Sequence, residues 1–403
     1  MLTSLFFIVL FFSPLLLGAD VKSVLFPLQI LIFSGFFLHF RVPAKQISFS
    51  DLPSLLWVVW TVLAFLLTLS TCFSVYPDLS LKLLTYFFAL SACFMLSAFG
   101  RLSPKQVIFI CSLMIFSSDL QVVIGVLQKL EILPHKHWIP RDLMAGTFIN
   151  HNRFSGMMEI TLPMVLAFIF LKKDRPNIFM KHFLYGSLVI QTGGLILAQS
   201  RAGWLSAAAA LFYFFIAASG KVRVRQMMAG ILAVFLISAA FVVLNKETLG
   251  KRFETLLELK KDSSAMERIE FWKVGFQMVK DHPFIGTGPG TVPVVFPKYR
   301  SENLRYYVNQ LHNDYLGWMA EAGIFTFPCL CVMILFFLFR PWSEKGKPLA
   351  IAAGTAVLAM ALHSLVDYNL RVPAIGFYLA VLLGLSFRKE SSHSDTMTST
   401  ITS

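Results

Sequence analysis

Residues 245–290 read NKETLGKRFETLLELKKDSSAMERIEFWKVGFQMVKDHPFIGTGPG, and they begin a long polar stretch in a chain that is otherwise strongly apolar. The stretch continues to QLHNDYLGWMAEAG at residues 310–323, where an apolar segment resumes. The sequence on either side has the composition of membrane anchors, while the stretch supplies most of the polar side chains. This contrast predicts a membrane protein with one large loop at a membrane surface.

The overall composition supports the same class. The 403 residues are 56% hydrophobic and 14% charged, and a soluble chain of this length would need more charge to cover its surface. The formal net charge of +13 is typical of basic cytoplasmic loops. Because no run of Lys and Arg with interleaved aromatic residues occurs, nucleic acid is not an expected partner. The five cysteines lie in or beside apolar segments, which gives no disulfide framework.

Apolar runs long enough to cross a membrane recur along the chain, and the fold class predicted from them is an all-α polytopic membrane protein. About twelve transmembrane helices are expected, with a large, partly helical periplasmic loop between the ninth and the tenth. The seventh run is the weakest. The runs are Leu2–Leu17, Val24–Phe40, Ser54–Ser70, Ser80–Phe99, Gln106–Leu130, Phe154–Leu171, Phe183–Ala198, Ala202–Ser219, Met227–Leu244, Tyr315–Phe339, Leu349–Val366 and Val372–Phe387.

These runs divide the chain into four predicted parts. Residues 1–244 form an N-terminal bundle of about nine spans, and residues 245–314 form the loop. Residues 315–388 hold about three further spans, and residues 389–403 form a disordered tail. With the N-terminus inside, each inner loop holds at least two cations, and the short outer loops together hold fewer. The positive-inside rule therefore places both termini in the cytoplasm and the long loop outside.

The loop is expected to contain two amphipathic helices that lie on the membrane face. The first covers residues 249–257, and Pro283 ends the second. The apolar stripe of the second consists of Ile269, Trp272, Phe276 and Val279.

His312 and Asn313 lie where the loop becomes the tenth run, and Asn313 is a suitable N-cap there. Both residues could simply begin a helix. Glu321, however, follows on the same helical face as Asn313 and Asp314, roughly 10–13 Å further along at 1.5 Å per residue. A carboxylate at that depth needs a partner, so this group is a candidate site.

Arginines on the outer side form a second candidate group. Arg201 lies between the seventh and eighth runs, Arg268 lies beside Trp272, and Arg153 begins the sixth run. Arg305 approaches His312 along the loop. Such residues are often anchors that reach to the membrane surface. The planar guanidinium is nevertheless suited to a pyrophosphate, because it pairs with two oxygens at once.

Three further segments carry polar groups with weaker signals. The alternating glycines of HPFIGTGPG (282–290) could form a backbone nest for an anion, or only a turn. GTFINHN (146–152) offers the side-chain donors Asn150 and Asn152. His363 and Asp367 are four residues apart on one helical face, where an acid can orient an imidazole or make a local hydrogen bond. No ligand spacing indicates a metal; the HxH of residues 135–137 alone is weak, and no cofactor is expected.

Five motifs in order resemble the O-antigen ligase superfamily. The resemblance implies a metal-independent glycosyltransferase in the bacterial inner membrane, with its active site facing the periplasm. It would move a glycan from undecaprenyl pyrophosphate to an acceptor hydroxyl, with inversion at the anomeric carbon. In the ligases the acceptor is a sugar of the lipid A core. The motifs are GTFINHN (146–152), QSRAGW (199–204), ERIEFWKVGFQMVKDHPFIGTGPG (267–290), HNDYLGWMAEAG (312–323) and HSLVDYNLRVP (363–373).

The resemblance also assigns residues. The loop histidine of the family falls on His312, and its two arginines fall on Arg201 and Arg268. By resemblance the arginines bind the pyrophosphate, and His312 activates the acceptor hydroxyl or orients the donor. We add Glu321 as a second catalytic candidate. Arg153 and Arg305 are further candidates for pyrophosphate binding, and the supporting residues are Asn150, Asn152, Asn313, His363 and Asp367.

Four activities stay open at this point. A ligase is favoured by the chain length and by the lack of an extra soluble domain after the last span. A polymerase of O-antigen or exopolysaccharide repeats and a protein O-glycosylating enzyme share the same donor chemistry. A transporter or lipid flippase is the alternative of another class, although polar residues here gather at one face rather than at mid-membrane.

Overall fold

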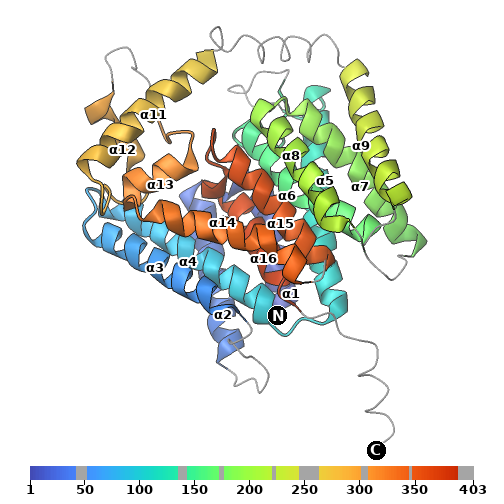
Figure 1. Cartoon of the computed structure of the whole chain (residues 1–403), viewed down its shortest axis with the longest axis horizontal. Coiled ribbons are helices and arrows are strands. Elements are labelled where there is room, and N and C mark those ends of the chain that lie inside the picture. Colours follow the sequence, from blue (N-terminus) through green and yellow to red (C-terminus); the bar gives the residue numbers. More distant parts are fainter. Residues whose placement is uncertain are drawn as a thin grey trace, which may run out of the picture.

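The computed structural model of the chain describes residues 1–41, 52–134, 143–171, 177–219, 224–244, 263–300, 307–344 and 347–388. The regular elements within these ranges are helices (Figure 1). In chain order they are α1 (Leu2–Leu15), η1 (Leu17–Ala19), α2 (Lys22–Phe40), α3 (Ser54–Cys72), α4 (Pro77–Phe99), α5 (Pro104–Lys129), α6 (His151–Phe170), α7 (Ile178–Leu197), α8 (Arg201–Ala218), α9 (Val224–Leu244), α11 (Ser263–Asp281), α12 (Val292–Tyr299), α13 (Asp314–Ala322), α14 (Thr326–Ser343), α15 (Pro348–His363), η4 (Asn369–Arg371) and α16 (Pro373–Leu385).

The helices confirm an all-α membrane protein. Seven helices among the described residues are long and apolar enough to cross a membrane, namely α2 to α6, α8 and α14. Shorter apolar helices include α1, α15 and α16. The seventh predicted run, which forms α7, falls in neither group, in keeping with the polar residues at its middle. A multi-pass protein is therefore supported, while the number of twelve spans stays a prediction.

Helices α6 and α15 lie at the centre of the bundle. In an apolar 18-residue segment of α6, 83% of the residues are buried, compared with 22–56% in the corresponding segments of the other candidate spans. α15 packs against α6, α8, α14 and α16, and Figure 1 shows it among them. Small side chains let helices approach closely in a membrane protein, where packing rather than water drives their association. In α15 these residues are Ala350, Ala352, Ala353, Gly354 and Ala356.

The tenth predicted run, Tyr315–Phe339, is not one helix. It is divided into α13 and α14 at Gly323, whose φ of +89° favours glycine. A Cβ atom at Gly323 would overlap the carbonyl oxygen of Phe284, and the amide of Ile324 donates to the carbonyl of Pro283 at 2.8 Å. The prediction of one continuous span is wrong because the chain after α11 lies against this point.

The helices α11, α12 and α13 share a small core of their own at one end of the bundle (Figure 1). The second predicted amphipathic helix is present as α11, and its predicted stripe is divided between two surroundings. Trp272 and Val279 pack against this core, whereas Ile269 and Phe276 are 41% and 62% exposed. The first amphipathic helix (249–257) and the tail (389–403) lie outside the described residues. The core residues are Phe271, Val274, Met278, Val292, Val295, Phe296, Val308, Leu311, Leu316 and Ala320.

The break at Gly323 predicts a selective loss of stability. Gly323→Ala should destabilise the protein by roughly 1–3 kcal/mol through backbone strain alone, with a further cost from overlap with Phe284. The matched control is Gly186→Ala in α7, where a Cβ atom meets nothing within 4 Å. That change should be neutral or stabilising by up to about 1 kcal/mol. Thermal unfolding of the detergent-solubilised protein checks both; equal melting temperatures would contradict the assigned strain.

Candidate active site

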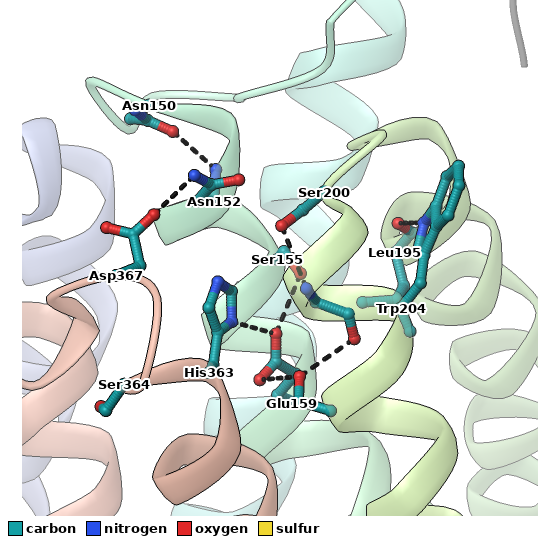
Figure 2. A network of polar contacts seen from close by, with 12 residues as sticks. Asn150, Asn152, Ser155, Glu159, Leu195, Ser200, Trp204, His363, Ser364 and Asp367 are labelled. Carbon is teal, nitrogen blue, oxygen red and sulfur yellow. Dashed lines mark hydrogen bonds and ion pairs between the residues drawn. The ribbon is translucent and has the colours of Figure 1, made fainter. Parts of the chain in front are cut away.

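The motifs singled out in the sequence lie together at one end of the bundle. Asn152 is in the first turn of α6, and Asp367 follows α15, which packs on α6 and α8. Arg268 comes from α11, and His312 directly precedes α13. Figure 2 shows Asn152 facing Asp367, with His363 and Glu159 one layer deeper in the bundle. Polar side chains that are far apart in the sequence therefore form one site.

Asp367 is the centre of this site. Its carboxylate is almost completely buried, and Oδ2 accepts a hydrogen bond of 2.5 Å from Nδ2 of Asn152. Oδ1 lies 3.3 Å from Nδ1 of His312, and Oδ2 lies 3.8 Å from a terminal nitrogen of Arg268. Three elements thus present polar or cationic groups to one carboxylate.

The charge of Asp367 follows from these neighbours. Burial raises the pKa of a carboxyl group, because the charged form loses its hydration. Here His312, His363 and Arg268 outweigh burial and hold the pKa of Asp367 well below its usual range. The carboxylate is therefore ionised at neutral pH, as an acceptor that orients an imidazole must be.

His312 is held at the surface of the site. Its φ is +51°, an uncommon value for a residue with a side chain. Its carbonyl oxygen accepts a hydrogen bond of 3.3 Å from the indole of Trp272. The imidazole stacks near Phe271 and meets Tyr368 edge-on, with ring centroids 5.9 Å and 4.8 Å away. Its side chain keeps 24% exposure, so the ring is fixed on its inner side and open outward.

The start of α13 is fastened to the turn after α15, which explains how His312 reaches Asp367. The amide of Asp314 donates to the carbonyl of Ser364 at 2.9 Å, and the hydroxyl of Ser364 donates to Oδ2 of Asp314 at 2.9 Å. Asn313 caps α13 by accepting from the amide of Leu316 at 3.0 Å, as predicted. These contacts fix the segment that carries His312 next to the turn that carries Asp367.

Arg153 is already paired within the protein. Its guanidinium donates to Asp20 at 2.6 Å and to the hydroxyl of Tyr368 at 2.7 Å, and it lies 4.9 Å from the centre of that ring. Because the ring of Tyr368 packs edge-on against His312, Arg153 fixes the ring that contacts the imidazole. The structure therefore brings Arg153 to the site through Tyr368 rather than as a free cation.

The QSRAGW motif sets the first turn of α8 against α6. Ser200 caps α8 by accepting from the amide of Gly203, and Trp204 donates to the carbonyl of Leu195 at 2.9 Å (Figure 2). A Cβ atom at Gly203 would overlap Oγ of Ser155, so glycine permits this approach. Arg201, the half-buried first residue of α8, is thereby placed at the same end of the bundle as Asn152.

His363 does not pair directly with Asp367 as its spacing suggested. Its Nδ1 lies 2.8 Å from Oε1 of Glu159 on α6, and both side chains are fully buried. Glu159 also accepts hydrogen bonds from Ser155 at 3.0 Å and Ser206 at 3.1 Å. Asp367 is linked to His363 through the backbone, where its amide donates to the carbonyl of His363 at 3.0 Å.

Glu321 has the partner that its depth required, but it lies in a separate cluster. Its Oε2 accepts from Arg371 at 2.5 Å, and its Oε1 accepts from the amide of Val292 at 3.1 Å. Arg371 also lies 3.4 Å from Asp314, so two carboxylates share one buried guanidinium. The structure does not bring Glu321 into contact with His312, and this geometry favours a structural role.

The alternating glycines are used for packing, which argues against an anion nest. Gly286, Gly288 and Gly290 all have positive φ. The amide of Thr287 donates to the carbonyl of Ala320 at 3.1 Å, and that of Gly288 donates to the carbonyl of Glu321 at 2.9 Å. With these amides bonded to the end of α13, the loop fixes the position of that helix.

Several site residues were missed in the sequence. Glu159 could have been noticed as a lone acid inside an apolar run, which is costly without a partner. Asp20 and Tyr368 are ordinary loop residues whose importance appears only from their contacts.

The remaining predicted residues are Asn150 and Arg305. Asn150 accepts from the amide of Asn152 and caps α6. Arg305 and the HxH of residues 135–137 lie outside the described residues, and within the described part no group of three or more His, Cys, Asp or Glu has the arrangement of a metal site.

The fold and the site define a multi-pass membrane protein with an imidazole, a buried carboxylate and arginines gathered at one end. A family model described as O-antigen ligase matches residues 186–331. This match confirms the resemblance to the O-antigen ligase superfamily and supports a membrane glycosyltransferase of the ligase or polymerase type. It includes Arg201, Arg268 and His312, whereas Glu159 and Asp367 lie outside it. No curated protein matches the chain.

The separate roles of Glu321 and His312 predict different outcomes when each is truncated. Glu321→Ala leaves Arg371 buried with one carboxylate fewer, and breaking a buried pair costs about 3–5 kcal/mol. His312→Ala removes a partly exposed ring and should leave a folded protein. Gel filtration and thermal unfolding in detergent measure the difference. A folded, inactive Glu321→Ala variant would return Glu321 to the catalytic residues.

Proposed function

We propose that the protein is an O-antigen ligase-like glycosyltransferase, which moves a glycan from undecaprenyl pyrophosphate to an acceptor hydroxyl, with a lipid A core sugar as the preferred acceptor. The observation that carries this proposal is the pairing of His312 with the buried carboxylate of Asp367 beside Arg268. An oriented base and a cation for a departing phosphate are what such a transfer needs.

His312 is proposed as the general base. With Nδ1 facing ionised Asp367, the proton of neutral imidazole stays on Nδ1 and the lone pair of Nε2 is free. Nε2 then takes the proton of the acceptor hydroxyl as its oxygen attacks the anomeric carbon. The resulting imidazolium is stabilised by the carboxylate. Because the attack is direct, the configuration at that carbon is inverted.

The leaving group is undecaprenyl pyrophosphate, which departs with the electron pair of the broken carbon–oxygen bond. Arg268 and Arg201 are proposed to bind its phosphates, since a guanidinium pairs with two oxygens. Arg268 lies 3.8 Å from Asp367, and its Nε makes no hydrogen bond within the part of the chain that the structure describes. Arg153 takes a supporting role because Asp20 and Tyr368 already occupy it. Asn152 and Asn313 support the site by bonding Asp367 and capping α13.

The proposed position is the periplasmic face of the bacterial inner membrane, with both termini in the cytoplasm. The distribution of cations supports this orientation. The outer helix α11 also carries an exposed apolar face, with Met266 46%, Ile269 41% and Phe276 62% exposed. Such a face suits a helix lying on a bilayer, where a lipid-linked donor and phospholipids are the neighbours.

The acceptor distinguishes a ligase from a polymerase of surface polysaccharide repeats. Deletion in the parent bacterium should leave free lipid A core and accumulate carrier-linked polymer, both visible by gel analysis. Core bearing single repeats would instead indicate the polymerase. Unchanged surface glycans with altered export of another solute would overturn the glycosyltransferase and favour a transporter.

The site predicts that His312→Ala and His312→Asn both lose transfer. Removal of a general base costs about 10²–10⁴-fold in rate. Asparagine tolerates the positive φ of residue 312 but cannot take a proton. Transfer of a carrier-linked glycan is measured in membranes at matched expression. The control is His282→Asn in the same loop, which should be near normal. Normal turnover of His312→Asn would remove this residue from the catalytic group.

Transfer is expected to depend on the planar guanidinium groups of Arg201 and Arg268. Arg201→Lys and Arg268→Lys should each lower transfer on the order of 10²-fold, as loss of a donor to a developing anion does. The same change at exposed Arg300, Arg300→Lys, is the matched control and should have little effect. Equal activities for the three variants would show that charge alone suffices.

Transfer is also expected to be independent of divalent metal. The carboxylates in and beside the site pair with cationic or imidazole groups, which suits charge pairing rather than metal binding. Asp367 pairs with His312 and Arg268, Glu159 with His363, and Glu321 with Arg371. Purified protein should keep its activity in EDTA. Activity lost in EDTA and restored by Mg²⁺ or Mn²⁺ would contradict this mechanism.

A further inference from the structure

The site contains a second acid–imidazole pair directly beneath the first. Glu159 and His363 are 2.8 Å apart, and Asp367 and His312 are 3.3 Å apart. The two pairs are joined where the amide of Asp367 bonds the carbonyl of His363 at 3.0 Å. Carboxylate and imidazole thus alternate from the centre of the bundle to its surface.

His363 has one ring nitrogen without a partner among the described residues. Nδ1 faces Glu159, whereas Nε2 is buried and makes no hydrogen bond. Figure 2 shows that Nε2 points toward the layer in which Asn152 and Asp367 lie. A buried imidazole in this position is not explained by packing alone, because a polar atom without a partner is costly.

We propose that Glu159 and His363 are positioning residues for the transfer, acting through Asp367 on the base His312. This inference rests on the proposed function. Glu159 keeps His363 positively charged, and the charged ring keeps the Asp367 carboxylate ionised and facing His312. Like charges repel, so a positive His363 and a positive His312 disfavour each other across Asp367.

The charges around the two imidazoles support this arrangement. The carboxylate of Glu159 from α6 lies 2.8 Å from His363, and Asp367 after α15 and Arg268 from α11 are the charged groups of the next layer. His363 in turn helps to lower the pKa of Asp367. Around His312 the further groups are Tyr368, which bonds Arg153, and Asp314 at the start of α13.

The test is the pH dependence of kcat/KM for transfer by the purified full-length protein. Glu159→Gln should leave His363 neutral, and His363→Gln removes its charge directly. In both variants the acid limb of the profile should move to higher pH, by on the order of one pH unit for a unit charge at short range in a protein. Glu159→Asp, which keeps a carboxylate, should restore much of the wild-type profile.

A control separates charge from packing. Ser206→Ala removes another hydrogen bond to the same carboxylate, from Ser206 Oγ to Oε2 of Glu159 at 3.1 Å, without touching His363. Its acid limb should stay in place. If single variants fail to fold, the double variant Glu159→Gln with His363→Gln carries no charge at either position and should show the same displacement. An unmoved limb in the folded variants, or a limb moved equally by Ser206→Ala, would overturn the proposal.

The outcomes also distinguish this inference from the proposed function. If the wild-type protein transfers glycan and His312→Ala does not, an unmoved acid limb rejects only the positioning role. If the wild-type protein transfers no glycan from the carrier lipid, the proposed function itself fails.

Discussion

A carboxylate buried next to a membrane must be surrounded by groups that stabilise its charge, and Asp367 shows how much structure this requires. Asn152 from α6, Arg268 from α11 and His312 from the segment before α13 all reach it. Moving any of these elements leaves the charge uncompensated, which is costly in a medium of low polarity. The same requirement that fixes this end of the bundle therefore also brings the polar groups of the candidate site together.

Two buried arginines hold the neighbouring segments in place. Arg371 binds Glu321 and lies near Asp314, which fixes α13 against the turn after α15. Arg153 binds Asp20 and Tyr368, which fixes the ring beside His312. Both supporting arginines form ion pairs inside the protein, whereas His312 keeps an exposed side. In this protein the exposure of a charged group, rather than its charge, separates a residue that can meet substrate from one that holds the scaffold.

The sequence predicted the helical membrane class and the residues that meet at the site, but not how they pair. Polar residues in an apolar chain are conspicuous, so His312, Arg268 and Asp367 could be recognised from composition and motif. Helical spacing suggested a pair of His363 with Asp367, yet the imidazole turns to Glu159, because partners across helices depend on how the helices are rotated and packed. The break at Gly323 and the buried face of α11 depend on neighbouring segments in the same way.

The contributions to the site come from widely separated parts of the chain, and this has a consequence for biosynthesis. Asn152, Arg201, Arg268 and His312 all leave the ribosome before the turn at residues 364–368, and chains generally fold in that order. Until α15 has entered the membrane, the imidazole lacks its acid and the arginine its counter-ion. If the chain has the proposed function, the site is therefore incomplete while the nascent protein is inserted, and it is completed only in the last steps of assembly.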